Sequence, residues 1–310
     1  MTENIPEHSR NFHLSREVQE ALALVNIGIR NVNPRIVNEG LENLSDIKKP
    51  SERTSVLSAL VEHLERGSAL YDSERTGYIK GHSPQGVEIR SGILVAIGNL
   101  GWQGCDTEAA VKPLLNTLQR DPSLSVRKTA AETLLYLTDR RSLPEIKEVT
   151  GNLITSADGE AVLHKLAESF REFTPLFNDR FKTELLLYVL EQAGSASLRS
   201  AVLDAFERAG VYASGQAALV ADKLRQADSL DKQALFIFAL GAIGPEAKSQ
   251  LHVIFSVLAD SSTSQVGSHK LLNGIYAEMS RAELIELSVG RIAGLDGVAE
   301  LRRQCPQLSG

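Results

Sequence analysis

The sequence has little of several features that common protein classes require. Of its 310 residues, two are cysteines, one is a tryptophan and 5% are aromatic. Cys105 and Cys305 lie far apart and show no disulfide spacing pattern, which predicts two free thiols in a reducing compartment. A small aromatic share beside 43% apolar residues suits close helix-on-helix packing better than a sandwich or a barrel.

An excess of positive charge and a long apolar run are also missing. The 33 basic and 39 acidic residues give a net charge of −6 with both signs scattered, so no broad positive field favours a nucleic-acid partner, although a local basic groove is not excluded. The longest apolar run, Ala234 to Gly244, is about half a membrane span. Residues 1–13 read as a disordered or extended segment without a secretory signal. We expect a soluble, cytoplasmic protein with no membrane partner.

Motifs for catalysis and metal binding are missing as well. The sequence has no HExxH or CxxC, and its seven histidines form no two-ligand helical pair with a third ligand nearby. It has no nucleophile elbow and no phosphate-binding glycine loop, since Gly98 to Gly101 reads as a helix ending. We therefore expect no metal, no cofactor and no catalytic residue.

What the sequence does have is a repeated pair of amphipathic helices. Glu108 to Thr138 carries apolar residues at helical spacing on both sides of Asp121-Pro122-Ser123. Proline disfavours helical geometry in the residue before it, and Ser123 or Ser125 can cap the helix that follows. Such a hairpin cannot bury its apolar faces alone, so it requires similar neighbours.

Similar pairs are predicted along most of the chain. Leu14 to Leu44 forms a first pair, with Pro34 at the start of its second helix. The other predicted helices are 50–67, 87–100, 143–154, 161–173, 176–190, 198–209, 215–224, 230–243, 247–258, 266–279 and 282–292. Equivalent positions in the second helices recur about every 36 residues, at Arg90, Arg127, Leu163, Arg199, Lys232 and Ser268. We predict one domain over residues 14–294, interrupted by a loop at 67–86 and followed by a cap and tail at 295–310.

These units resemble HEAT repeats, in particular the bacterial HEAT-like repeats known from phycobilisome lyases. The unit from Glu108 to Thr138 has the family's proline in its first helix, its turn aspartate and its Val-Arg opening of the second helix. The matching residues are Pro113, Asp121, Val126-Arg127, the similar openings Ile89-Arg90 and Leu198-Arg199, and the helix endings 98–101 and 241–244. The resemblance implies an all-α fold, a right-handed α-solenoid of about seven hairpins. Its second helices would line a concave face that most relatives use to bind another protein.

Enzymes of this family provide the alternative function. Deoxyhypusine hydroxylase binds iron through His-Glu dipeptides, which this chain lacks; Glu62-His63 has the reverse order. Alkyl-base DNA glycosylases use a basic concave face with tryptophans, which one tryptophan and an acidic net charge disfavour. Phycobilin lyases have no sharp motif to test.

The basic positions Arg90, Arg127, Arg199 and Lys232 have two interpretations. They can form a stripe that binds an acidic partner, or each can bond the turn aspartate or the carbonyl groups of the adjacent unit. We favour the structural interpretation, because the equivalent positions Leu163 and Ser268 are not basic and would interrupt a binding stripe.

The loop at 67–86 is the other candidate site, since long loops within compact arrays are often functional. Its candidate contact residues are Tyr71, Arg75, Tyr78, Lys80 and His82, accompanied by Asp72 and Glu74. A flexible insertion without a partner is the alternative. Trp102, in a predicted Gly-rich turn, is interpreted as a packed cover for the core in preference to a partner contact, and it is retained with Arg90 and Arg127 as a further candidate contact residue. Together these features predict a non-catalytic scaffold, such as an adaptor, an assembly factor or an inhibitor, that binds a protein partner.

Overall fold

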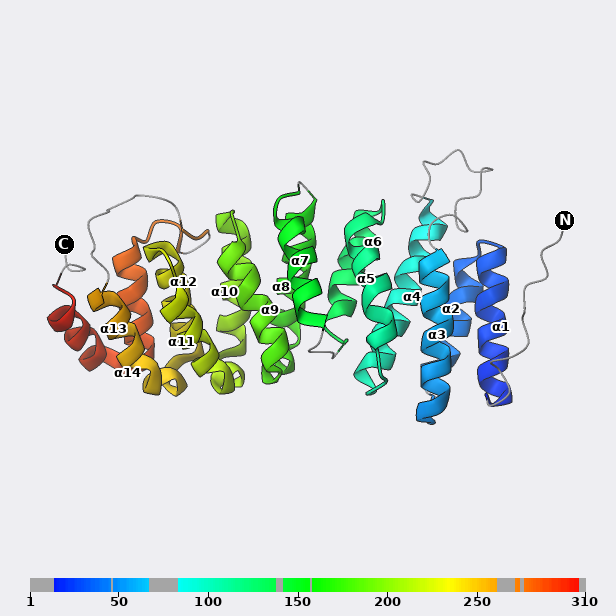
Figure 1. Cartoon of the computed structure of the whole chain (residues 1–310), viewed down its shortest axis with the longest axis horizontal. Helices are drawn as coiled ribbons and strands as arrows, with labels where there is room; N and C mark the ends of the chain where they lie inside the picture. The colour runs from blue at the N-terminus through cyan, green and yellow to red at the C-terminus, as the bar shows by residue number, and fades with distance from the viewer. Residues whose placement is uncertain are drawn as a thin grey trace. The chain divides into compact units, whose positions relative to one another are not determined.

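The computed structural model describes residues 14–45, 47–66, 83–137, 142–156, 158–260, 271–273 and 276–306. Within these ranges every regular element is an α-helix or a short 3-10 helix and no strand occurs, which confirms the all-α prediction (Figure 1). No helix in the same ranges has both the length and the apolar character needed to cross a membrane. The predicted N-terminal segment 1–13 lies outside the described residues.

The chain divides into two compact units, Met1–Val149 and Thr150–Gly310. The helices that lie within the first unit are α1 (Arg16–Arg30), α2 (Pro34–Asn43), α3 (Pro50–Arg66), α4 (Pro84–Trp102), α5 (Glu108–Arg120) and α6 (Leu124–Leu134). Helix α7 (Leu143–Ile154) spans the division. The second unit contains α8 (Gly159–Glu172), η3 (Thr174–Asn178), α9 (Arg180–Gln192), α10 (Ala196–Ala209), η4 (Gly210–Gln216), α11 (Ala217–Gln226), α12 (Leu230–Ile243), η5 (Gly244–Gln250), α13 (Leu251–Asp260) and α14 (Arg281–Gln304).

Unit 1 is built from helix pairs that contact one another in sequence order. Helices α1 and α2, α3 and α4, and α5 and α6 pack as pairs, while α2, α4 and α6 form a row of second helices. The predicted apolar stripes face inward, and Leu94 and Leu134 are fully buried. Proline begins three of the helices because its missing N–H is not needed in a first helical turn.

Unit 2 repeats this arrangement with two rows. Helices α8, α10, α12 and α14 form the row of second helices, and α9, α11 and α13 contact one another in a row of first helices. Neighbouring second helices pack closely: a Cβ atom added to Gly241 of α12 would lie 2.6 Å from the Ser288 Cα atom of α14. Phe206 of α10 is buried, as its stripe predicts.

Left-handed glycines mark the end of each of the last three second helices. Gly210 follows α10 with φ of 48°, Gly244 follows α12 with φ of 85°, and Gly294 interrupts α14 with φ of 66°. Only glycine adopts such angles at little cost, so each position reverses the chain toward the next first helix. The part of α14 that follows the kink at Gly294, residues 295–304, is therefore equivalent to a first helix.

Three predicted boundaries were wrong. The loop was predicted to extend to residue 86, but α4 begins at Pro84 because the Ser83 hydroxyl accepts the Gly86 N–H at 3.1 Å. The helix predicted over 266–279 is not α-helical in its described residues 271–273 and 276–279. The last helix was predicted to end at residue 292, but it continues to Gln304, where Leu301 is buried against the unit.

Candidate protein-binding surface

The outer face of α4 exposes two large apolar side chains. Val95 is 52% exposed and Trp102 is 59% exposed. They lie seven residues apart, which is about two helical turns, so both project from one face of the helix. Glu88 lies one further heptad back and is also exposed, which gives this face an acidic end. An exposed tryptophan on a helix is typical of contact surfaces, and the exposed valine extends its apolar area.

A tyrosine from the neighbouring second helix extends this surface. The Tyr136 ring, just after α6, contacts the Trp102 ring edge-on, with 6.2 Å between the ring centroids. Glycines make this approach possible: a Cβ atom added to Gly101 would lie 2.6 Å from the Tyr136 carbonyl oxygen. The Thr133 hydroxyl also donates to the Leu94 carbonyl at 3.1 Å and ties α6 to α4. We call Val95, Trp102 and Tyr136 the α4–α6 patch.

Trp102 therefore differs from its predicted role. It is the last residue of α4 and not part of a Gly-rich turn, and it does not cover the core. The physical reason is that Gly98 and Gly101 stay helical and face α6, which turns position 102 outward. Sequence reasoning missed Val95 and Tyr136. The available signal was the spacing of Val95 and Trp102, both outside the buried stripe that contains Leu94 and Ile97.

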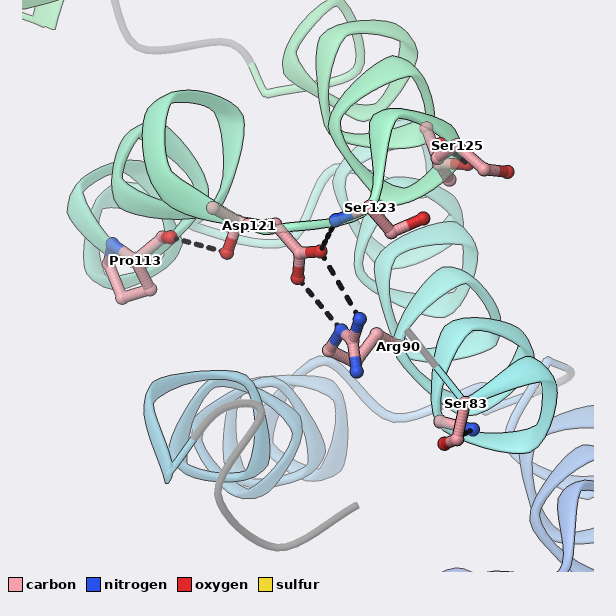
Figure 2. A network of polar contacts seen from close by, with 9 residues as sticks. Ser83, Arg90, Pro113, Asp121, Ser123 and Ser125 are labelled. Carbon is pink, nitrogen blue, oxygen red and sulfur yellow. Dashed lines mark hydrogen bonds and ion pairs between the residues drawn. The ribbon is translucent and has the colours of Figure 1, made fainter. Parts of the chain in front are cut away.

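The Arg90 side chain is buried and bonded within the fold. Its Nε donates to Asp121 Oδ2 at 2.8 Å and its Nη2 donates to Asp121 Oδ1 at 3.2 Å, as Figure 2 shows. Arg90 is 1% exposed, so it presents almost no surface to a partner. Asp121 Oδ1 also accepts the Ser123 N–H at 2.8 Å, whereas the Ser123 side chain does not cap α6 as predicted. The pair therefore joins the start of α4 to the turn between α5 and α6.

The other basic positions also bond nearby groups. Arg127 Nε donates to the Leu118 carbonyl at 3.1 Å, and Arg199 Nε donates to the Ala193 carbonyl at 2.9 Å. The Lys232 ammonium lies 3.0 Å from Asp228 Oδ1. These three contacts lie within each residue's own helix pair, whereas the structural interpretation expected bonds to the adjacent unit, as the Arg90–Asp121 pair makes.

The remaining predicted contact residues, Tyr71, Arg75, Tyr78, Lys80 and His82, lie outside the described residues. In the part of the chain that the structure describes, no three His, Cys, Asp or Glu side chains gather in a way that could hold a metal ion. Cys105 and Cys305 are buried free thiols, and burial raises the pKa of each above its ordinary value. Thiols in that state are poor nucleophiles.

Comparisons with family models, with curated proteins and with solved structures found no match to this chain. The class that the structure itself defines is an all-α protein with helix pairs in sequence order within each unit, and with an apolar, aromatic patch on the second helices of unit 1.

Proposed function

We propose that this chain is a non-catalytic scaffold of the HEAT-like type that binds a protein partner through its second helices. The proposal includes a right-handed solenoid of about seven hairpins, in which the row of second helices forms the concave face. It is supported by the order of packing inside each unit, where α2, α4 and α6 form one row and α8, α10, α12 and α14 form another. It also includes a cytoplasmic location, supported by the two free thiols.

The observation that carries the proposal is the exposure of Val95 and Trp102 on that row. Tryptophan and tyrosine provide a large contact area with few rotatable bonds, and such residues dominate the energetics of protein interfaces. The α4–α6 patch is also fixed before binding, because Trp102 and Tyr136 already contact each other. A partner that buries them would not have to order them first. In this proposal the loop at 67–82 supplies a second part of the contact.

Affinity purification of the full chain from its own source cells tests the proposal. Wild type is compared with a double variant, Val95→Ser with Trp102→Ala, and with a chain that lacks residues 71–82. The matched control is Val211→Ser with Tyr212→Ala, since these residues are similarly exposed at η4 in unit 2. We expect the patch variant to lose a partner that the control retains, and the loop deletion to weaken its recovery.

Two results would count against this function. If the patch variant and the control recover the same proteins, the α4–α6 patch is not the contact surface. If wild type recovers no protein above an unrelated bait, the scaffold proposal fails and the HEAT-type enzyme, lyase-like or glycosylase-like, becomes the better hypothesis.

A further inference from the structure

Unit 2 covers part of its row of second helices with a segment of its own chain. Within each of the preceding helix pairs, α9 joins α10 through residues 193–195 and α11 joins α12 through residues 227–229. The connection from α13 to α14 runs over residues 261–280 instead. We call its described residues, 271–273 and 276–280, the returning segment; Figure 1 shows it in orange, reaching back past α12 toward α10.

Two hydrogen bonds fix the returning segment on α10. The Asn273 N–H donates to Ser200 Oγ at 2.7 Å, and the Tyr276 hydroxyl donates to Glu207 Oε1 at 2.6 Å. The residue numbers of the paired positions increase together, from 273 to 276 in the segment and from 200 to 207 in α10, so the segment runs parallel to α10. Leu271 and Leu272 are buried, and Leu272 lines one cavity together with Leu203 of α10. The segment therefore contacts α10 through a main-chain donor and a tyrosine, with its leucines buried alongside.

The Arg291 side chain fixes Tyr276, which lies in the C-terminal part of the returning segment. Arg291 of α14 donates from Nη1 to Glu207 Oε1 at 2.6 Å and from Nη2 to the Tyr276 hydroxyl oxygen at 2.8 Å. Its guanidinium carbon lies 5.2 Å from the Phe238 ring centroid and 5.8 Å from that of Tyr276. The Arg291 and Glu207 side chains remain 31% and 25% exposed, so water reaches this group and competes for its hydrogen bonds.

The segment is an addition to a row that is complete without it. Helices α10, α12 and α14 contact one another directly, and α14 begins with its own capping box at Ser280 and Glu283. The segment also leaves the surface of α10 incompletely filled. A cavity of about 300 Å³ lies beside it, lined on α10 by Ser197, Ser200, Ala201, Asp204 and Glu207. We call this surface the α10 groove.

We propose that the α10 groove is a peptide-binding site and that the returning segment is its occupant in the free protein. The partner that the groove fits is a protein with a non-helical segment of the same chemistry. Such a segment has two adjacent aliphatic side chains, a free main-chain N–H and a tyrosine four positions after the second aliphatic residue. Ser200 and Glu207 accept from it as they accept from Asn273 and Tyr276. This site is separate from the α4–α6 patch and is tested without the partner of the proposed function.

The returning segment has an advantage over a separate partner because it belongs to the same chain as the α10 groove. A tethered segment competes at an effective concentration of about 1 mM. A free peptide of the same sequence should therefore bind poorly to wild type and well to a chain whose own segment is defective. Exchange of this kind makes the surface available only to partners that bind more strongly than the returning segment does.

A labelled peptide with the sequence of residues 271–280 tests this inference by fluorescence anisotropy with the full chain. The released variant carries Leu272→Ser and Tyr276→Ala, which alter the segment and leave α10 intact. We expect the peptide to bind the released variant at least ten times more tightly than wild type. Adding Ala201→Arg to the released variant should abolish binding, because that side chain fills the α10 groove.

Two controls make the result specific. A peptide with the same two substitutions should not bind, and the chain with Val211→Ser and Tyr212→Ala should behave as wild type. Should the double variant misfold, as judged by circular dichroism, Tyr276→Phe removes one oxygen only and must still rank above wild type. Equal binding of both peptides, or no binding to a folded released variant, would overturn the inference.

Discussion

The second helices of the two units differ in what covers them. In unit 1, α4 exposes Val95 and Trp102, and Tyr136 contacts that tryptophan edge-on. In unit 2, the returning segment lies on α10, buries Leu271 and Leu272 and is held by Arg291. The comparison shows that the row of second helices in unit 2 carries a connecting segment of its own chain. Under the proposed function, a protein partner binds the exposed patch of unit 1.

Arg90 in unit 1 and Arg291 in unit 2 both form ion pairs, but the two pairs have different structural roles. Arg90 is buried and its ion pair with Asp121 joins a helix start to a turn, so it is part of the fold of unit 1. Arg291 is partly exposed and holds an added segment in unit 2. The predictions that follow begin with this difference and proceed from the largest expected effect to the smallest.

Replacing Arg90 should have the largest effect. Arg90→Ala leaves the buried Asp121 carboxylate without its cation, and breaking a buried pair costs about 3 to 5 kcal/mol of unfolding free energy. Arg127→Ala is the matched control, because Arg127 bonds the Leu118 carbonyl from the equivalent helix position. Its expected cost is about 1 kcal/mol. Urea denaturation followed by circular dichroism measures both; equal costs would remove the distinction between Arg90 and the other basic residues.

Leu272→Ala should rank second. Leu272 is 1% exposed, and truncating a buried leucine costs about 2 to 4 kcal/mol through lost burial and a residual cavity. Val95→Ala, on the exposed face of α4, should change stability by less than about 0.5 kcal/mol. Thermal unfolding of the two variants measures this contrast. A small cost for Leu272→Ala would mean that the returning segment is only loosely held.

The hydrogen bond from Tyr276 to Glu207 should be lost at high pH, which would weaken the attachment of the returning segment to α10. Burial and then the hydrogen bond to Glu207 raise the pKa of Tyr276 above its ordinary value. The folded protein therefore favours the protonated phenol, and this contribution is complete below the unfolded pKa of about 10 and is lost as pH rises through the folded pKa. Hydrogen exchange at the Asn273 amide should accelerate more above that pH than base catalysis alone explains.

Tyr276→Phe removes the titrating group and provides the control for this pH effect. The variant should lose about 1 kcal/mol at neutral pH, the usual contribution of one hydrogen bond. It should show none of the additional acceleration above pH of about 10. The same excess acceleration in the variant would assign the pH effect to another group.

Trp102 should have the smallest effect on stability and a clear spectroscopic signal. Trp102→Ala should change the free energy of unfolding by less than about 0.5 kcal/mol, because most of the indole is in water. As the only tryptophan, Trp102 reports on unit 1 alone, and acrylamide should quench it efficiently in the free protein. Binding of a partner to the α4–α6 patch should shift its emission to the blue and reduce quenching. Strong protection in the free protein would contradict the exposed position.

The repeated helix pairs could be predicted because their apolar residues follow the helical period. Leu94, Leu134 and Phe206 lie on such stripes and are all buried. The same logic failed for the described residues 271–273 and 276–279, where Leu271 and Leu272 matched the expected spacing. Two adjacent leucines are buried equally well by a helix or by a segment laid on a neighbouring helix, so periodicity over a short stretch does not separate the two.

The candidate surface could be predicted only in part, for a similar reason. Trp102 was recognised as unusual, but its exposure depends on which way Gly98 and Gly101 face, and that is set by α6, more than 20 residues further along the chain. Arg90 was weighed as both a structural and a binding residue. The choice between these roles required the position of Asp121, which lies in another helix pair.

Sequence alone determined the helical class, the inward stripes and the positions where chains turn, because spacing and the local chemistry of proline and glycine act over a few residues. Tertiary structure decided which apolar residues stay in water, which arginine is enclosed and where the connection before α14 runs. Those outcomes depend on contacts between residues far apart in the chain, such as Tyr276 with Glu207 and Arg90 with Asp121. No local pattern contains that information, because the free energy of each contact exists only once both partners are in place.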